Sequence, residues 1–223
     1  LLTGIAVDDG LIRSIDDPMR DYALDRMFHT DQNHDITWRQ MLQLTSEWEG
    51  SLWDKPDLVD RNRELGVGVD NSKKGTPRAL QKPGTHWEYN DVRVNRFSLS
   101  LMQVFRRPLP DVLRTRIMDP IGASSSWRWH HYRNSFYEIG GVPIPSVPGG
   151  THWGGGLWIN SHDHALMGQL MLAKGQWKGQ RIISEAWIDA LRTPCDIRPG
   201  YGLLWWLNTG REYMPNAPES SYF

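Results

Sequence analysis

The chain has 223 residues, of which 39% are hydrophobic and 23% charged, and its formal net charge is −1. This length allows one large domain or part of a larger one, and the composition is that of a globular protein. The near-zero charge and the absence of a basic stripe argue against nucleic-acid binding. No run of about 18 apolar residues predicts a membrane span. The single cysteine, Cys195, excludes an intrachain disulfide but leaves the cellular compartment unknown.

Tryptophan is frequent, with 12 residues in the chain. Each indole brings a large apolar surface and one N–H group that needs a partner when it is buried. Two interpretations are open: the tryptophans fill a core, or some of them form the walls of a ligand pocket. Trp48 and Trp53, in a polar stretch, are candidates for the roof of such a pocket.

Both ends of the chain indicate an internal segment of a longer protein. Leu1, Leu2, Ile5 and Ala6 recur at helical spacing with Gly10 after them, so the chain is expected to begin inside a helix. It ends at Phe223 soon after an apolar run. The absence of a targeting signal therefore carries no information about localisation.

Helices are predicted where a capping residue precedes apolar residues at helical spacing. Their expected ranges are Asp17 to Met27, Thr37 (with Gln40 as a capping box) to Leu44, Asp91 to Phe105, Pro110 to Met118, and two later helices capped by Ser161 and Ser184. The glycine- and proline-containing stretch 47–83 predicts a long loop, which in compact domains is often functional. Residues 124–150 are expected to be irregular.

Strand signals are concentrated near the end of the chain. Glycines 154–156 predict a tight turn that enters a strand at 157–159. The run YGLLWWL, residues 201–207, predicts a buried strand because it is short, apolar and bounded by Gly200 and Asn208.

The segment PGTHWEYND, residues 83–91, places Tyr89 just before the predicted helix at Asp91. A tyrosine with an ordinary pKa of about 10 is a poor base at neutral pH, but a nearby ammonium group or helix N-terminus lowers that pKa. Considered alone, Tyr89 is either a catalytic proton carrier or a residue that packs the turn.

Six segments in order resemble the serine β-lactamase and penicillin-binding-protein-like hydrolases, especially the class C β-lactamases, related esterases and 6-aminohexanoate-dimer hydrolases. The opening LLTGIAVDDGLIRSIDDPM resembles the helix that carries the Ser-x-x-Lys motif and the segment after it, and ITWRQMLQLTSEWEG resembles the LLxHTSG block. PGTHWEYND resembles the PGxxxxYSN block. The other three are MDPIGA, GGGLWINSHDHALMGQLML with RIISEAW, and YGLLWW. The resemblance implies an α/β (α+β) fold, with an antiparallel sheet flanked by helices and a helical lobe, incomplete in residues 1–223.

The resemblance implies acyl transfer, in which the serine of Ser-x-x-Lys attacks a carbonyl and the lysine and tyrosine move its proton. Tyr89 is the catalytic residue that carries over. The Ser-x-x-Lys motif is expected upstream of Leu1 and the third motif downstream of Phe223, so these 223 residues alone are expected to be inactive. The alternative is a non-catalytic penicillin-recognising or glycan-binding protein with a tryptophan-lined pocket; the upstream serine distinguishes the two.

Three further residues are candidates for substrate binding. Asp91 stands where the family has an asparagine, and an ionised carboxylate neither donates to a substrate carbonyl nor favours a tyrosinate nearby. An ester or a linear amide is therefore a more suitable small-molecule substrate than a β-lactam. His152 and Trp153 precede the glycines, where the resemblance implies the mouth of the site; loop packing is the alternative.

His162-Asp163-His164 resembles a metal-binding pair. The predicted cap at Ser161 places both histidines in the first turn of a helix, where residues two apart point in different directions. They are therefore interpreted as polar residues of the cap, and no metal or other cofactor is predicted.

Overall fold

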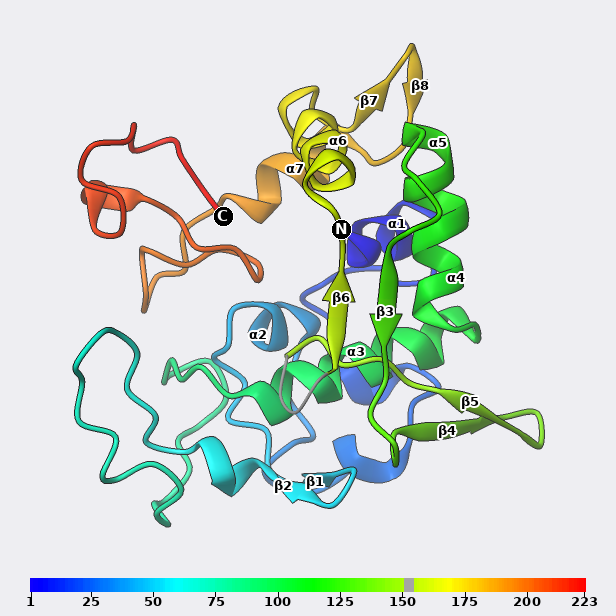
Figure 1. Cartoon of the computed structure of the whole chain (residues 1–223). Helices are drawn as coiled ribbons and strands as arrows, with labels where there is room; N and C mark the ends of the chain where they lie inside the picture. The colour runs from blue at the N-terminus through cyan, green and yellow to red at the C-terminus, as the bar shows by residue number, and fades with distance from the viewer. Residues whose placement is uncertain (151–154) are drawn as a thin grey trace. The chain divides into compact units, whose positions relative to one another are not determined.

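The computed structural model describes residues 1–150 and 155–223 (Figure 1). They divide into two compact units, Leu1–Ser14 with Val94–Ile188 and Ile15–Arg93 with Asp189–Phe223. Helices alternate with short antiparallel strand pairs, which confirms the predicted mixed class. None of the helices in these two ranges is both long enough and apolar enough to cross a bilayer.

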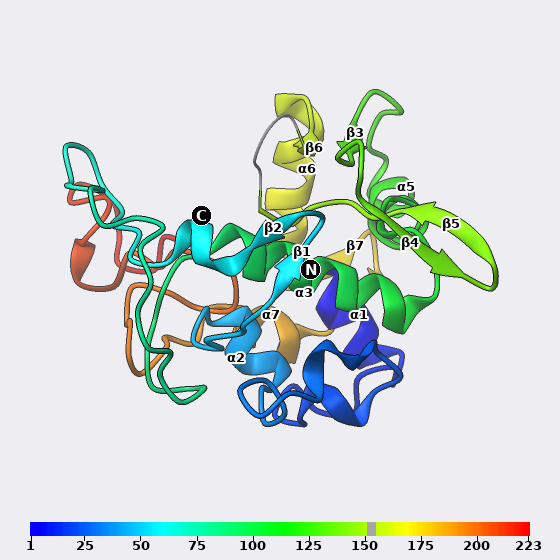
Figure 2. The same ribbon diagram turned by 90° about the horizontal axis from the view of Figure 1, so that it is seen from below.

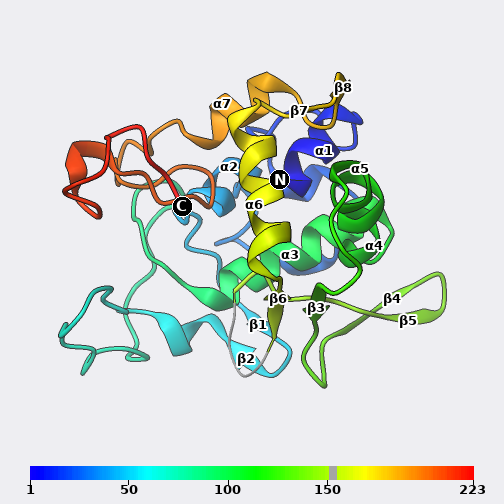
Figure 3. The same ribbon diagram turned by 45° about the horizontal axis from the view of Figure 1, so that its top comes forward.

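The helices of the first unit follow the predicted pattern closely. They are α1 (Leu2–Asp8), α3 (Asp91–Phe105, from Val94 onward), α4 (Leu109–Leu113), a π-helical turn (Arg114–Met118), α5 (Asp119–Ile121), α6 (Ser161–Leu172) and α7 (Glu185–Leu191, to Ile188). One short helix was expected over 110–118; instead α4, the π-helical turn and α5 follow one another without a break (Figure 3). Asn160, not Ser161, caps α6, because its side chain accepts from the Asp163 N–H.

The strands of the first unit lie where an irregular segment was expected. β3 (Arg128–His130) pairs with β6 (Gly156–Trp158), β4 (Phe136–Ile139) with β5 (Val142–Pro145), and β7 (Gln176–Trp177) with β8 (Gln180–Arg181). The prediction of irregular structure over 124–150 was therefore wrong. The β4–β5 hairpin extends away from the rest of its unit (Figures 1 and 3).

A close helix contact holds α1 against α7 within the first unit. A Cβ added at Gly4 would lie 2.1 Å from the Trp187 ring, so the glycine is what allows the two helices to approach. The Asp8 carboxylate accepts from the Ser184 N–H at 2.8 Å, and the Ser184 hydroxyl accepts from the Trp187 N–H at 3.3 Å. The predicted cap at Ser184 is confirmed.

The second unit is built from short elements and long connections. It contains α2 (Trp38–Leu42), β1 (Ser51–Leu52) paired with β2 (Lys55–Pro56), the first turn of α3, and 3-10 turns over Met19–Asp21, Arg26–Phe28, Asp57–Asp60 and Thr209–Arg211. Thr37 and Gln40 form the predicted capping box of α2. After the 3-10 turn Asp57–Asp60, a long loop extends away from the β1–β2 pair (Figures 1 and 2).

Two expectations for the second unit were wrong. The helix predicted from Asp17 to Met27 is replaced by two 3-10 turns, because Tyr22 is extended between them and packs its ring edge-on against Trp38 at 5.4 Å. The run 201–207 is not a continuous strand. It forms isolated bridges only, and Leu204 has a φ of +61°, which turns the chain back on itself.

Candidate functional site

Tyr89 is held by the residues on either side of it, all within the second unit. The Glu88 N–H donates to the Leu44 carbonyl at 3.0 Å, which fixes the segment in front of the tyrosine. Asn90 caps α3, because its Oδ1 accepts from the N–H groups of Val92 and Arg93 at 3.1 and 3.2 Å. Its Nδ2 donates to the Asp57 carbonyl at 2.8 Å. Tyr89 therefore precedes the helix cap, as the sequence predicted.

The ring of Tyr89 belongs to an aromatic cluster formed with Trp87, Tyr201, Trp206 and Tyr213. Tyr89 stacks on Trp206 at a centroid distance of 5.8 Å and an angle of 11°. Trp206 in turn meets Tyr201, Tyr213 and Trp87 edge-on, at 4.8, 5.2 and 6.0 Å. The ring is thereby fixed in orientation, while its hydroxyl has no hydrogen-bond partner among the residues described.

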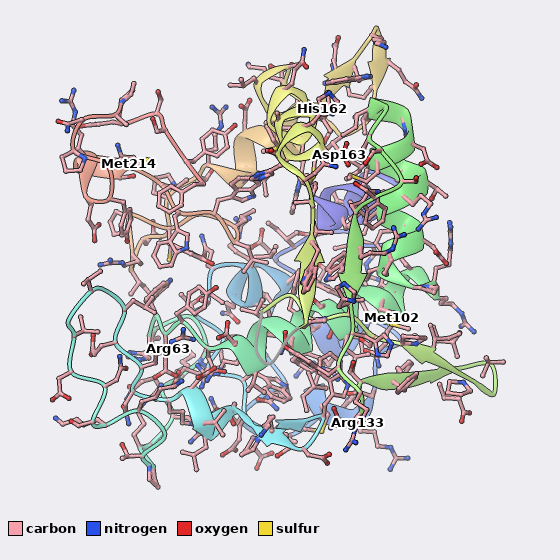
Figure 4. All side chains as sticks on the ribbon, viewed as in Figure 1. Arg63, Met102, Arg133, His162, Asp163 and Met214 are labelled. Atoms are coloured by element: carbon pink, nitrogen blue, oxygen red, sulfur yellow. The ribbon has the colours of Figure 1, made fainter. Side chains whose placement is uncertain are left out.

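Arg63 is the residue that sequence reasoning missed. It lies just after the 3-10 turn Asp57–Asp60, at the start of the long loop (Figure 4). Its Nη1 donates to Asp91 Oδ2 at 2.7 Å, and its Cζ lies 5.4 Å from the centre of the Tyr89 ring. Nothing in the polar sequence around it signals this contact, since its partners are 26 and 28 residues away. Asp91 is therefore ion-paired and largely buried.

The pKa of Tyr89 is raised above the ordinary value. Burial is the largest cause, and the negative charges of Asp91 and Asp60 add to it, whereas the positive charge of Arg63 opposes the shift. The negative charge of Asp91 disfavours the tyrosinate, as the sequence predicted. Tyr89 is consequently a neutral phenol at neutral pH, and a further cation close to its oxygen is needed to favour the phenolate, the form that accepts a proton.

Beside Tyr89 lies a buried ion cluster that contains three carboxylates and three guanidinium groups. Its members are Glu47, Asp57, Glu88, Arg61, Arg78 and Arg93. Arg93, in the first turn of α3, contacts all three carboxylates, at 2.8, 3.2 and 3.2 Å. The formal charges balance, which is what allows so many ions to be buried together.

Glu47 is the most completely enclosed member of the cluster, with an exposed fraction of 0%. Burial alone would raise its pKa, but hydrogen bonds and charge from Arg78 and Arg93 outweigh burial and lower the pKa to about 2. Its backbone has a φ of +49°, a region that disfavours side chains with a Cβ. In the resemblance this position is the glycine of HTSG; here a residue with a side chain adopts a conformation that favours glycine, and its carboxylate pairs with Arg78 and Arg93.

Searches by sequence find no matching protein-family model and no matching curated protein. The structure does match solved structures. A provisionally named 6-aminohexanoate-dimer hydrolase from Bacillus anthracis gives a TM-score of 0.63 over 99% of this chain and 58% of its own, at 15% identity. A provisionally named β-lactamase from Bacteroides dorei gives 0.62 over 92% and 61%, at 18% identity. A penicillin-binding-protein homologue from Caulobacter crescentus gives 0.62 over 98% and 66%, at 14% identity.

The chain has the β-lactamase and penicillin-binding-protein fold. The resemblance read from the six sequence segments is thus confirmed at the level of the fold. The identities are too low to carry more than the fold. The chain spans 58% to 66% of the length of these three structures. The activity of the full-length protein is therefore proposed below.

Of the four residues predicted for the site, Tyr89 and Asp91 lie together in the second unit of this β-lactamase-type fold. His152 and Trp153 lie outside the described residues. Trp48, a candidate for the roof of a pocket, is fully buried, and its carbonyl accepts from Arg93 Nε at 3.0 Å. Of the two interpretations left open for the tryptophans, Trp48 fits the core one. Trp53 is absent from the lining of the cavity described below.

The histidines suspected of binding a metal lie in the first turn of α6, as predicted (Figure 4). His162 is exposed, and its Nδ1 is 3.6 Å from Asp163 Oδ1. Asp163 is buried and accepts from the Ser124 N–H at 2.8 Å and from the Ser124 hydroxyl at 2.6 Å. These contacts fasten the start of α6. Across the described ranges, no group of three or more histidine, cysteine or acidic side chains is placed to hold a metal ion.

A cavity of about 590 Å³ lies beside the aromatic cluster, within the second unit. Arg63, Trp87 and Glu88 connect it to the surroundings of Tyr89. Arg198 forms another part of its lining and lies with its Cζ 5.5 Å from the centre of the Trp87 ring. The volume falls within the usual range for small-molecule sites.

Proposed function

We propose that the full-length protein is a serine hydrolase that forms an acyl-enzyme on an ester or an amide, with Tyr89 as a proton carrier. The observation that carries this proposal is the placement of Tyr89: a ring locked by Trp206 and a hydroxyl without a partner, one residue before the cap of α3. The fold supports the proposal, because the matched structures include hydrolases.

The proposed reaction proceeds in two steps. A serine hydroxyl, supplied by a Ser-x-x-Lys motif upstream of Leu1, adds to the substrate carbonyl, and its proton passes to the lysine and tyrosine pair. The bond to the alcohol or amine then breaks, and this leaving group takes up the proton. Water hydrolyses the acyl-serine by the reverse sequence, releasing a carboxylic acid and restoring the serine.

Tyr89 has a specific requirement in this scheme. Its raised pKa keeps the phenol protonated until the lysine ammonium, a second positive charge besides Arg63, lies near its oxygen. With the ammonium there, the phenolate accepts the proton of the serine hydroxyl, and the phenol so formed donates that proton to the departing alcohol or amine. The Tyr89 oxygen has no hydrogen-bond partner in the described part of the chain, which leaves it available for both transfers.

The proposed substrates are esters and linear amides rather than β-lactams. Asp91 occupies the position from which an asparagine would donate an amide N–H, and its Oδ2 is already bonded to Arg63. A carboxylate offers no donor to a substrate carbonyl.

The test is Tyr89→Phe in the full-length protein, with Tyr137→Phe in β4 as the matched control. We expect turnover of p-nitrophenyl acetate to fall by about 10²–10⁴-fold in Tyr89→Phe, because general acid–base catalysis contributes on that order, and to stay unchanged in the control. Labelling by a fluorophosphonate probe should slow in parallel, while thermal melting and circular dichroism stay as in the wild type.

Two results would contradict the proposal. Wild-type turnover in Tyr89→Phe would remove the tyrosine from the mechanism. A full-length protein that neither turns over esters nor reacts with the fluorophosphonate would favour the non-catalytic binding protein. Nitrocefin cleavage faster than p-nitrophenyl acetate cleavage would reject the substrate preference alone.

A further inference from the structure

The lining of the 590 Å³ cavity carries three cations, two from the long loop after the 3-10 turn Asp57–Asp60 and one from the C-terminal segment of the second unit. They are Arg63, Lys73 and Arg198. Trp87 contributes an aromatic ring, against which the Arg198 guanidinium lies at 5.5 Å. Cation–π contact of this kind holds a guanidinium in place and leaves its edge available for hydrogen bonding.

Both arginines have donors to spare. Arg63 uses Nη1 for its hydrogen bond to Asp91, and Arg198 uses Nη2 for Glu212 and the Tyr213 hydroxyl, at 2.7 and 2.8 Å. A guanidinium carries five N–H donors. Arg198 Nε and Trp87 Nε1 are moreover buried without an acceptor in the described part of the chain. These two atoms have almost no accessible surface, so the donors open to a ligand in the cavity are the remaining N–H groups of the two guanidinium groups.

The acidic residues of the lining are largely engaged elsewhere. Glu88 Oε1 accepts from the Asn62 N–H at 2.7 Å, and its Oε2 lies 2.9 Å from Arg78. Both oxygens of Asp70 accept from Ser72. Glu64 is the remaining acid, and it lies on the exposed loop. Lys73, by contrast, has no ion-pair partner within the described ranges.

We propose that this cavity binds the carboxylate group of a small organic acid, with Arg198, Arg63 and Lys73 as its ligands and Trp87 packing against the apolar part. Bidentate guanidinium–carboxylate pairing matches the geometry of the arginines. The cavity adjoins Tyr89 through Arg63, so the acid is assigned as one end of the substrate or as the released product. This second assignment rests on the proposed hydrolase function, whereas the binding of the carboxylate does not.

The experiment compares benzoate with benzamide, which share a ring and differ in charge, by calorimetry on the full-length protein. We expect benzoate to bind about tenfold or more tightly than benzamide, because charge-assisted hydrogen bonds are the stronger class. Arg198→Gln should remove most of this preference. Lys73→Gln, at an exposed position where folding is not at risk, should weaken benzoate about threefold and leave benzamide unchanged. Lys82→Gln, an exposed lysine outside the lining, is the control.

Equal affinity for the two ligands, or a benzoate preference that survives both Arg198→Gln and Lys73→Gln, would overturn the proposal. A kinetic arm separates it from the hydrolase function. The p-nitrophenyl monoester of glutaric acid should have a lower KM than p-nitrophenyl butyrate. Lys73→Gln should raise the KM of the glutaric monoester and leave that of the butyrate unchanged. Benzoate binding without turnover of either ester would reject the hydrolase and keep the carboxylate site.

Discussion

Arg63 neutralises Asp91: its Nη1 lies 2.7 Å from Asp91 Oδ2, and the same guanidinium is 5.4 Å from the centre of the Tyr89 ring. The resemblance predicts an uncharged asparagine at position 91. The ion pair restores a formally neutral side-chain environment there. The guanidinium also lies over the Tyr89 ring, where its positive charge opposes the rise that Asp91 causes in the pKa of the tyrosine.

Asp91 and Arg63 should shift the pKa of Tyr89 in opposite directions. Asp91→Asn removes a negative charge and the nearer of the two carboxylates beside Arg63, so the pKa of Tyr89 should fall. Arg63→Gln should raise it. The measurement is a pH titration followed by NMR with ¹³Cζ-labelled tyrosine, with Tyr89→Phe assigning the signal. Shifts of the same sign in the two variants would show that the ion pair does not set this pKa.

The buried ion cluster should make stability depend on pH in the acid range. Glu47 has a pKa of about 2 in the folded chain against an ordinary value of 4.5, so the unfolded chain takes up the proton first. The stabilisation is therefore complete above about pH 5 and is lost as the pH falls towards 2, by about 3 kcal/mol. Urea unfolding between pH 7 and 2.5 should show this loss in the wild type and a smaller loss in Glu47→Gln.

At pH 7 the same variant tests the cluster directly. Glu47→Gln leaves Arg78 and Arg93 without part of their counter-charge in a buried site, so unfolding should become easier by about 3–5 kcal/mol. Asp35→Asn, which breaks an exposed ion pair with Arg20, is the control and should change stability by less than about 1 kcal/mol. Similar effects of the two variants would mean that the cluster is not a major source of stability.

The side-chain amide of Asn90, which caps α3, should stabilise the protein through both its oxygen and its nitrogen. Asn90→Ala removes the cap oxygen and the Nδ2 bond to the Asp57 carbonyl, and should cost about 2 kcal/mol. Asn90→Ser keeps a capping oxygen and lacks the Nδ2 donor, so it should cost about half as much. Chemical denaturation midpoints measure both. An equal loss in the two variants would assign the whole effect to the Asp57 contact.

Replacing either of two helical glycines by alanine should change stability, in opposite directions, because one lies at the contact between α1 and α7 and the other has open space around it. Gly4→Ala would place a Cβ 2.1 Å from the Trp187 ring and should destabilise the protein by about 1–3 kcal/mol. Gly168→Ala, in the exposed part of α6 with open space around it, should stabilise by about 0.5–1 kcal/mol through helix propensity. Thermal melting of the two variants is the measurement, and a stabilised Gly4→Ala would show that the helices are not closely packed.

Local signals in the sequence were sufficient for most helices. The capping box at Thr37 and Gln40, the start of α3 at Asp91 and the cap at Ser184 all involve residues within four positions of one another. Their hydrogen bonds form within one turn of chain, so the pattern of residue types predicts them. The long polar stretch 47–83 was likewise predicted as mostly loop, and the position of Tyr89 before a helix followed from the same reasoning.

What only the tertiary structure decided depends on contacts between distant residues. The pairing of β3 with β6, the stacking of Tyr89 on Trp206 and the partnership of Arg63 with Asp91 join residues 26 to 117 positions apart. Single-residue patterns do not encode such pairings, because any arginine in a polar loop has the same local signature. The sequence therefore determined which residues carry the chemistry and where the helices begin, whereas burial and charge pairing in the folded chain decided their protonation and their partners.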